Sequence, residues 1–234
     1  EAVLPDTFEL PRRAMAIFAH PDDVDFGAAG TLAAWADRGV HITYCLVTSG
    51  QKGTNDAGMS RAKLARIRER EQMAAGAVVG AKEFVFLRRQ DGETEVSMRL
   101  RGEVCKAIRL HKPEVVFTQD PWRPYQMHPD HRVAGWSGLD GVIAARDHLF
   151  FPEQLKRGLT HHRVTRVYLF GTSDPNVWFD ISGTLDRKIA AISSHTSQVA
   201  DPVRLAERMR AFAAGAGRAW GLDAAEAFRS IELA

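Results

Sequence analysis

Cysteine is scarce in this chain, and positive and negative charges nearly balance. Only Cys45 and Cys105 occur among the 234 residues, each within an apolar stretch. Two such cysteines form no disulfide framework and lack the spacing of a cysteine-based metal centre. We therefore expect small core residues in a reducing, cytoplasmic setting. A formal net charge of +2 indicates neither a nucleic-acid partner nor a membrane partner.

Long apolar runs are also missing, since none approaches the roughly 20 residues that span a bilayer. The chain has no G-x-G-x-x-G turn of the kind that binds dinucleotides, and no H-E-x-x-H helix of the common metalloproteases. Its composition, 45% hydrophobic and 26% charged, is ordinary for a globular protein. We expect a single domain over residues 1–234.

Short apolar runs alternate with helical patterns along the whole chain. Strands are expected at residues 14–19, 41–47, 83–87, 114–118, 166–170 and, with a weaker pattern, 177–180. Helices are expected at residues 27–38, 60–79, 96–111, 130–147, 184–194, 202–214 and 224–231. This alternation predicts an α/β fold, with a Rossmann-like, doubly wound, mostly parallel sheet flanked by helices.

Two similar polar segments follow expected strands. His-Pro-Asp-Asp at 20–23 comes after the first strand, and His-Pro-Asp-His at 128–131 comes after the fourth. Ligands bind beyond the carboxyl ends of the strands in open parallel sheets, so both segments are expected at one edge. The adjacent carboxylates of Asp22 and Asp23 repel each other unless a cation lies among them.

Each segment pairs candidate metal ligands three residues apart, His20 with Asp23 and His128 with His131. In the opening turn of a helix such residues project to the same side. Imidazole and carboxylate together suit zinc, and three protein ligands with one open position are typical of a catalytic site. The sequence therefore predicts a catalytic zinc centre.

The chain resembles the PIG-L/LmbE family of zinc-dependent N-deacetylases. This family includes the N-acetylglucosaminyl-phosphatidylinositol, mycothiol-pathway and bacillithiol-pathway deacetylases. The resemblance extends over about residues 14–233. It rests on AHPDD and HPDH, supported by TSGQKG, RIREREQMAAGAVVGA, FLRRQDG, KPEVVFTQDP and HTSQV. It implies hydrolysis of an N-acetyl group on a small sugar or pseudosugar, which releases acetate and a free amine. It leaves the oligomeric state open, including a homo-oligomer.

The resemblance also implies roles for individual residues. His20, Asp23 and His131 match the ligands of one zinc ion, for which iron or cobalt is an alternative. Asp22 matches the general base that activates water. His128 matches the residue that stabilises the oxyanion, and Asp130 is expected to orient it. Arg68 and Asp91 match residues that bind the substrate.

Several of these residues also have a purely structural interpretation. Arg68 and Glu71 share the inward face of their helix and would also suit a buried ion pair. Asp91 precedes Gly92 in a good turn signal, and Asp130 alone would serve as a helix N-cap. Asp25 suits a first-turn acid favoured by the helix dipole. His195 has two candidate roles, support of the metal ligands and capping of a helix.

The identity of the substrate is less constrained by the sequence than the metal centre. Trp122 and Tyr125 are both candidates for an aromatic side chain that closes on it. Gln51 stands where the family loop often has glutamate. The alternative function is a zinc amidase for another small amide, such as a thiol conjugate or an antibiotic-type glycoconjugate. A non-catalytic sugar-binding protein of the same fold would lack a ligand or the base, and this chain lacks neither.

Overall fold

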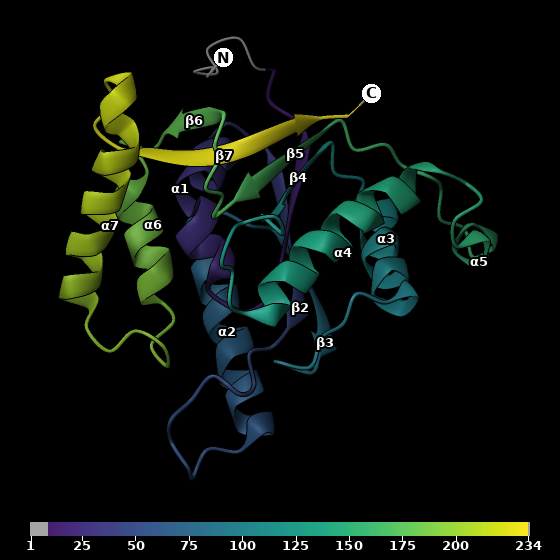
Figure 1. The fold of residues 1–234 in the computed structure, drawn as a ribbon, viewed down its shortest axis with the longest axis horizontal. Helices are drawn as coiled ribbons and strands as arrows, with labels where there is room; N and C mark the ends of the chain where they lie inside the picture. The colour runs from purple at the N-terminus through teal and green to yellow at the C-terminus, as the bar shows by residue number, and fades with distance from the viewer. Residues whose placement is uncertain (1–8, 234) are drawn as a thin grey trace.

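The computed structural model describes residues 9–233. It contains seven strands and seven α-helices within those residues (Figure 1). The strands are β1 (Arg13–Phe18), β2 (His41–Thr48), β3 (Glu83–Arg89), β4 (Val115–Gln119), β5 (Arg166–Phe170), β6 (Val177–Asp180) and β7 (Ala225–Glu232). The helices are α1 (Asp23–Asp37), α2 (Arg61–Val79), α3 (Met98–His111), α4 (Pro129–Arg146), α5 (Pro152–Lys156), α6 (Leu185–Ser193) and α7 (Pro202–Gly217), with a short 3₁₀ turn at Arg218–Trp220.

All seven strands form one sheet in the order β3-β2-β1-β4-β5-β7-β6. The first five in that order are parallel, whereas β7 pairs antiparallel with both β5 and β6. The chain runs outward from β1 through β2 to β3, and then returns to add β4 on the other side of β1. The adjacent carboxyl ends of β1 and β4 therefore form the topological switch point, where ligands bind in such sheets.

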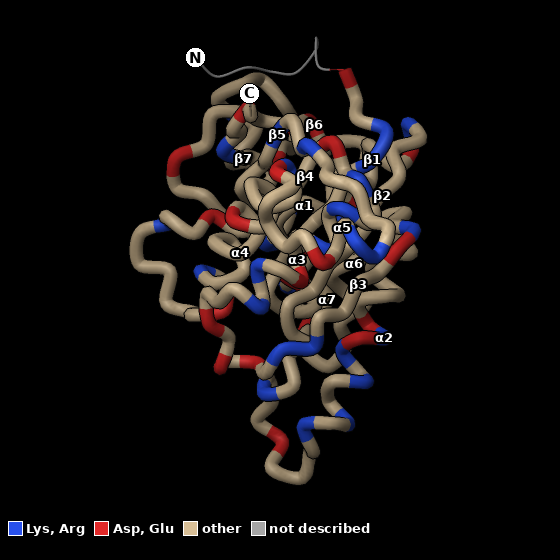
Figure 2. Tube along the Cα trace, turned by 90° about the vertical axis from the view of Figure 1, so that its right-hand side faces the viewer, with Lys and Arg blue, Asp and Glu red and all other residues tan. Residues whose placement is uncertain are grey.

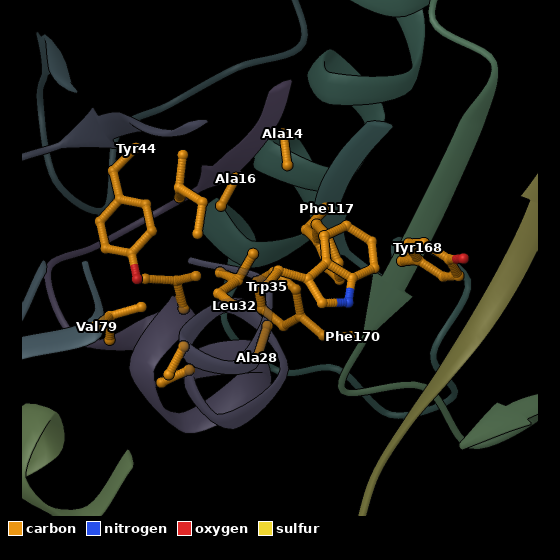
Figure 3. Packing of buried hydrophobic residues seen from close by; sticks show 14 of the residues in the cluster. Ala14, Ala16, Ala28, Leu32, Trp35, Tyr44, Val79, Phe117, Tyr168 and Phe170 are labelled. Carbon is orange, nitrogen blue, oxygen red and sulfur yellow. The ribbon is translucent and has the colours of Figure 1, made fainter. Parts of the chain in front are cut away.

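The central strands are nearly continuous in apolar residues because both of their faces are buried. On one face, alternate residues of β1 such as Ala16 and Phe18 pack with α1, α2 and α6. Figure 3 shows part of this cluster, in which Leu32 and Trp35 of α1 lie beneath the sheet. On the other face, Met15 and its neighbours pack with α3 and α4. The sheet is thus a layer between two groups of helices.

Local sequence signals explain the ends of α2. The Ser60 side chain accepts a hydrogen bond from the backbone amide of Lys63 at the start. Gly80 ends the helix in the left-handed conformation, with φ at 101°, which favours glycine. Figure 2 shows basic residues along this helix. Arg61, Lys63 and Arg70 are all exposed, as expected for a solvated face.

The α/β, mostly parallel, doubly wound fold is confirmed, and both cysteines are free and buried. The helix expected at 224–231 is wrong, because β7 occupies Ala225–Glu232. Alanine and glutamate favour a helix locally, but pairing with β5 and β6 overrides that preference. Helix α1 begins four residues before the expected 27, and α5 was not expected. Within residues 9–233, no helix combines the length and apolar character needed to cross a membrane.

Candidate active site

The first polar segment is a sharp turn between β1 and α1. Asp22 is the N-cap of α1, yet its side chain makes no capping hydrogen bond, and its φ is 99°. A non-glycine residue with such a φ is strained by about 1–3 kcal/mol, and such residues gather at functional sites. The carboxylate of Asp22 is therefore available for another role. Helix capping alone does not explain why an aspartate stands here.

His20 lies among three carboxylates. Its Nδ1 is 3.4 Å from Asp23 Oδ2, and its Nε2 is 3.1 Å from Asp130 Oδ2 and 3.3 Å from Asp91 Oδ1. Burial opposes protonation of this imidazole. Hydrogen bonds to Asp130, Asp23 and Asp91 outweigh that effect and raise the pKa of His20 to about 11. This surplus of negative charge around one ring fits a site built to hold a cation.

Asp23 connects the two segments. One carboxylate oxygen accepts a hydrogen bond from the His20 backbone amide at 2.7 Å, and the other lies 3.1 Å from His131 Nε2. Burial acts to raise the pKa of Asp23, but the hydrogen bonds from His131 and His20 outweigh it and lower the pKa. The structure thus brings together His20, Asp23 and His131, the three expected metal ligands.

The second segment begins α4. His128 is the N-cap, and its Nδ1 accepts a hydrogen bond from the Asp130 backbone amide at 3.3 Å. Its ring lies 4.5 Å from the His20 ring and 4.8 Å from the His131 ring, measured between centroids. Burial lowers the pKa of His128, and the neighbouring His20 and His131 lower it further. His128 is exposed, so its ring faces the solvent side of the site.

Asp22, the expected base, lies beside this centre. Its Oδ2 accepts a hydrogen bond from the Arg68 guanidinium at 3.1 Å. Burial and the charge of Asp23 raise the pKa of Asp22 to about 7, against the opposing effect of Arg68. A carboxylate with a pKa near neutrality is suited to exchange protons during a reaction.

Asp130 does not contact the His128 ring through its carboxylate, contrary to expectation. Its carboxylate accepts hydrogen bonds from the Gly92 backbone amide and from Thr94, at 2.6 and 2.5 Å. One of its oxygens also lies 3.1 Å from Nε2 of His20. Burial would raise the pKa of Asp130, but these partners lower it well below its usual range. Asp130 therefore orients His20, and the helix N-cap is His128.

Asp91 and Arg68 are both only 5% exposed. Asp91 accepts a hydrogen bond from the Lys52 backbone amide at 2.7 Å and faces His20 with its other oxygen. Burial opposes ionisation of Asp91, but His20 and the Lys52 amide lower its pKa. Arg68 donates to the backbone oxygens of Gly50 and Pro21 at 3.0 and 2.6 Å. Both side chains are thus already bonded within the protein.

The alternative ion pair between Arg68 and Glu71 is not formed. Arg68 pairs with Asp22. Glu71 instead accepts hydrogen bonds from Thr196 and Ser197, which hold the loop after α6.

The candidate closing aromatics differ in exposure. Trp122 is 55% exposed and packs edge-on against Trp136, whereas Tyr125 is 95% exposed.

Gln72, which the sequence did not single out, joins Asp25 and His195 in extending the site inward. Asp25 and His195 are both fully buried, and His195 Nε2 lies 2.8 Å from Asp25 Oδ2. The same oxygen accepts from Gln72 Nε2 at 2.8 Å. Gln72 in turn accepts from the backbone amide of Asp22 at 2.8 Å. The only sequence signals were the HTSQV stretch and the presence of Asp25 three residues after Asp22.

Ring nitrogens and carboxylates offer two compact donor groups within residues 9–233, His20-His128-His131 and His20-Asp91-Asp130. In each group the candidate ligand atoms lie within 4.8 Å of one another. A metal-binding histidine usually donates its second ring nitrogen to a carboxylate. Nε2 of His20 faces Asp130 in that way, which leaves Nδ1 toward Asp23. Of the expected ligands, His20 and His131 belong to the first group. Asp23 belongs to neither group, but its carboxylate lies 3.4 Å from Nδ1 of His20 and 3.1 Å from Nε2 of His131.

A cavity of about 370 Å³ is lined by Asp23 and His131, two of the expected ligands. Phe26 and Phe170 supply apolar walls, and polar side chains line the rest, namely Gln119, Asp120, Arg123 and Gln126. A small polar molecule with an apolar group would fit this lining.

Fold and site together define an α/β protein with an imidazole–carboxylate centre at the topological switch point. The chain belongs to the PIG-L family, described as GlcNAc-PI de-N-acetylase, which matches residues 15–140.

The chain is 34% identical to a diacetylchitobiose deacetylase from Thermococcus kodakarensis, over 85% of this chain and 74% of that protein. It is 27% identical to a probable N-acetyl-alpha-D-glucosaminyl L-malate deacetylase 2 from Bacillus anthracis, over 82% of this chain and 84% of the relative. A solved N,N'-diacetylchitobiose deacetylase from Pyrococcus horikoshii, complexed with an inhibitor, superposes with a TM-score of 0.92. That structure is 31% identical, and the match covers 98% of this chain and 87% of that one.

Proposed function

We propose that this protein is a metal-dependent N-deacetylase that acts on a small acetylated sugar or pseudosugar. The observation that carries the proposal is the position of Asp23, within 3.4 Å of His20 and 3.1 Å of His131, with Asp22 beside it. The relatives support the choice of substrate class, since those named above are deacetylases of acetylated amino sugars.

We assign one divalent cation, zinc by default, to His20, Asp23 and His131. When bound, the cation supplies Lewis-acid chemistry, which polarises an amide carbonyl and makes water more acidic. The donor set suits it, because two imidazoles and one carboxylate are common zinc ligands. Asp130 fixes the ring of His20 from behind, as carboxylates do for many metal-binding histidines.

The residues around the cation can carry the proton transfers. Asp22 takes a proton from the attacking water while the oxygen of that water forms a bond to the carbonyl carbon. The imidazole of His128 donates a hydrogen bond to the developing oxyanion. When the bond between carbon and nitrogen breaks, the amine receives the proton held on Asp22, or one from His128 that the proton on Asp22 then replaces, and acetate leaves.

Arg68 and Asp91 remain our proposed substrate-side residues, but their burial changes the form of that proposal. Both are held by bonds within the protein, so we assign them to the floor of the site. Direct contacts with sugar hydroxyls would then come from the cavity side chains, among which Arg123 and Gln126 are polar.

The test is acetate release by the zinc-loaded protein from N,N'-diacetylchitobiose and N-acetylglucosamine, compared with long-chain N-acyl sugars and acetylated peptides. We expect activity on the acetylated sugars, loss of activity after chelation, and recovery on return of zinc. A preference for peptide or long-chain amides would refute the sugar assignment while keeping the amidase. Full activity after complete metal removal would refute the metal-dependent mechanism.

A further inference from the structure

Two side chains of helix α2 hydrogen-bond the peptide unit between Pro21 and Asp22, one at its carbonyl and one at its amide; we call this pair of contacts the grip. Its carbonyl oxygen accepts a hydrogen bond from Arg68 at 2.6 Å, and its amide donates to Gln72 Oε1 at 2.8 Å. Arg68 and Gln72 are four residues apart on α2, so they lie on the same helix face. This grip explains how Asp22 keeps a φ of 99°, since strained backbone persists only where its surroundings fix it.

The loop that carries Gly50 leaves room for the Arg68 side of this grip. A Cβ atom added to Gly50, which has a φ of 61°, would lie 2.3 Å from the Arg68 guanidinium. A Cβ at Gly53 would lie 2.5 Å from the same group. Both glycines of the segment TSGQKG therefore allow Arg68 to reach Pro21.

The Gln72 side of the grip is oriented without ambiguity. A backbone amide can only donate, so the oxygen of Gln72 must face Asp22. Its nitrogen must then face Asp25, whose Oδ2 accepts at 2.8 Å. The same oxygen accepts from His195 Nε2 at 2.8 Å. His195, Asp25 and Gln72 thus form a continuous chain of hydrogen bonds that ends on the backbone of Asp22.

This series of hydrogen bonds lowers the stability of the fold compared with an apolar interior. Asp25 and His195 have no solvent exposure. Among residues 9–233, Asp25 Oδ1 and His195 Nδ1 have no hydrogen-bond partner. Buried polar atoms without partners destabilise a fold, and apolar side chains would pack there without that penalty. His195 also lies beyond residues 15–140, the part that the family match covers.

We propose that His195, Asp25 and Gln72 are positioning residues that hold the strained backbone of Asp22 and so aim its carboxylate. The proposal rests on the assignment of Asp22 as the base in the proposed function. It adds that the segment after α6, far along the chain from both HPD segments, belongs to the reaction machinery. None of the three residues contacts the substrate in this role.

The first test compares Gln72→Leu with Gln154→Leu. Gln154 is a matched control, because it is also a buried glutamine that donates to a backbone oxygen, that of Gly102 at 2.7 Å, and accepts from Arg109. It lies in α5, on the other side of the sheet from α2. Both variants should lose thermal stability. Only Gln72→Leu should lower kcat, by about 10- to 100-fold as expected for a misplaced catalytic group, with KM and bound zinc unchanged.

A measurement independent of activity accompanies the kinetics. The Asp22 amide is held by Gln72 Oε1, so its hydrogen exchange, followed by NMR, should be faster in Gln72→Leu than in the wild type or in Gln154→Leu. Unchanged exchange at Asp22 would overturn the proposal even if the wild type released no acetate. A negative result for the three positioning residues can therefore be distinguished from a negative result for the proposed function.

The second test uses His195. His195→Gln retains an amide nitrogen that can reach the place of Nε2, whereas His195→Leu has a similar size and no donor. We expect His195→Gln to preserve slow exchange at Asp22 and most of kcat, and His195→Leu to lose both. Equal behaviour of the two folded variants would show that His195 serves packing alone and would overturn its role. If His195→Leu does not fold, Gln72→Leu still decides the proposal.

Discussion

The two HPD segments have the same first three residues, yet the structure uses them in opposite ways. In the first segment the histidine is buried, and in the second it is exposed. The aspartates are reversed: the Asp22 side chain is 18% exposed, whereas that of Asp130 has no exposure. The first segment therefore exposes its acid to solvent and buries its imidazole, and the second exposes its imidazole and buries its acid.

Backbone conformation accounts for much of this difference. Asp22 has a φ of 99° and leaves its carboxylate off the end of α1. The N-cap of α4 is His128, the first residue of its segment and not the third, and it has an ordinary φ of −72° and accepts a capping hydrogen bond. The turn that begins α4 is relaxed, while the turn that begins α1 is held by Arg68 and Gln72. Similar sequences thus supply a base on one side of the proposed metal and an oxyanion donor on the other.

The strongest test of these different roles of the two segments removes the proposed metal ligand of the second segment, His131. His131→Ala leaves Asp23 without its partner at 3.1 Å, so we expect loss of most bound zinc. Turnover should fall by more than the roughly 10²- to 10⁴-fold typical of a missing acid or base. Metal analysis of the purified variant measures this directly, with the exposed His161→Ala as control. Full zinc content in His131→Ala would contradict the ligand assignment.

Asp22→Asn should produce the next largest effect. It removes the base and keeps the side-chain size, so kcat should fall by about 10²- to 10⁴-fold with zinc retained. Its matched partner is the adjacent Asp23→Asn, which weakens a ligand and should release zinc. Zinc content and kcat measured on both variants separate the roles. Loss of zinc from Asp22→Asn and retention by Asp23→Asn would mean that the two roles are exchanged.

The sequence allows the candidate centre to be predicted because its residues are close in the chain and lie at strand ends. The alternation of strands and helices places residues after β1 and β4 at one edge, and their side-chain types point to zinc. The conformation within each turn is not predictable in this way. Whether Asp130 contacts His128 or His20 depends on Gly92 and Thr94, which precede it by 38 and 36 residues and donate hydrogen bonds to its carboxylate.

Strand β7 and the contact between Asp25 and His195 were not predicted for the same physical reason. Strand β7 is recognisable only through its neighbours β5 and β6, because its own residues favour a helix. Asp25 and His195 are 170 residues apart, and no local pattern joins them. In each case a contact between distant parts of the chain overrides or supplements the local preference.

His128 offers a test of the relaxed turn. His128→Ala should lower kcat by about 10²- to 10³-fold, the usual effect of losing an oxyanion donor, without loss of zinc. It should also destabilise α4 by about 1 kcal/mol through the lost cap. His128→Asn restores a capping acceptor, so it should show the kinetic defect with a melting temperature close to that of the wild type. A normal kcat in either variant would exclude His128 from the reaction.

Asp130→Asn should have the smallest effect of the four, and its size distinguishes two metal sites. If Asp130 only orients His20, the substitution keeps an oxygen for the Gly92 amide and His20 but removes the charge. Zinc affinity should then fall by about 10- to 100-fold, as is typical of a carboxylate behind a metal-binding histidine. At saturating zinc, kcat should return close to the wild-type value.

The competing arrangement places the cation among Nε2 of His20, Asp91 and Asp130, whose candidate ligand atoms lie within 4.8 Å of one another. Asp130 would then be a ligand itself. Asp130→Asn would release zinc as completely as His131→Ala does in the arrangement we propose, and His131→Ala would retain it. Zinc titration of both variants against a competing chelator decides between the two. A fall of about 10- to 100-fold in Asp130→Asn, beside near-complete loss in His131→Ala, is the pattern that assigns Nδ1 of His20 to the metal and Nε2 to Asp130.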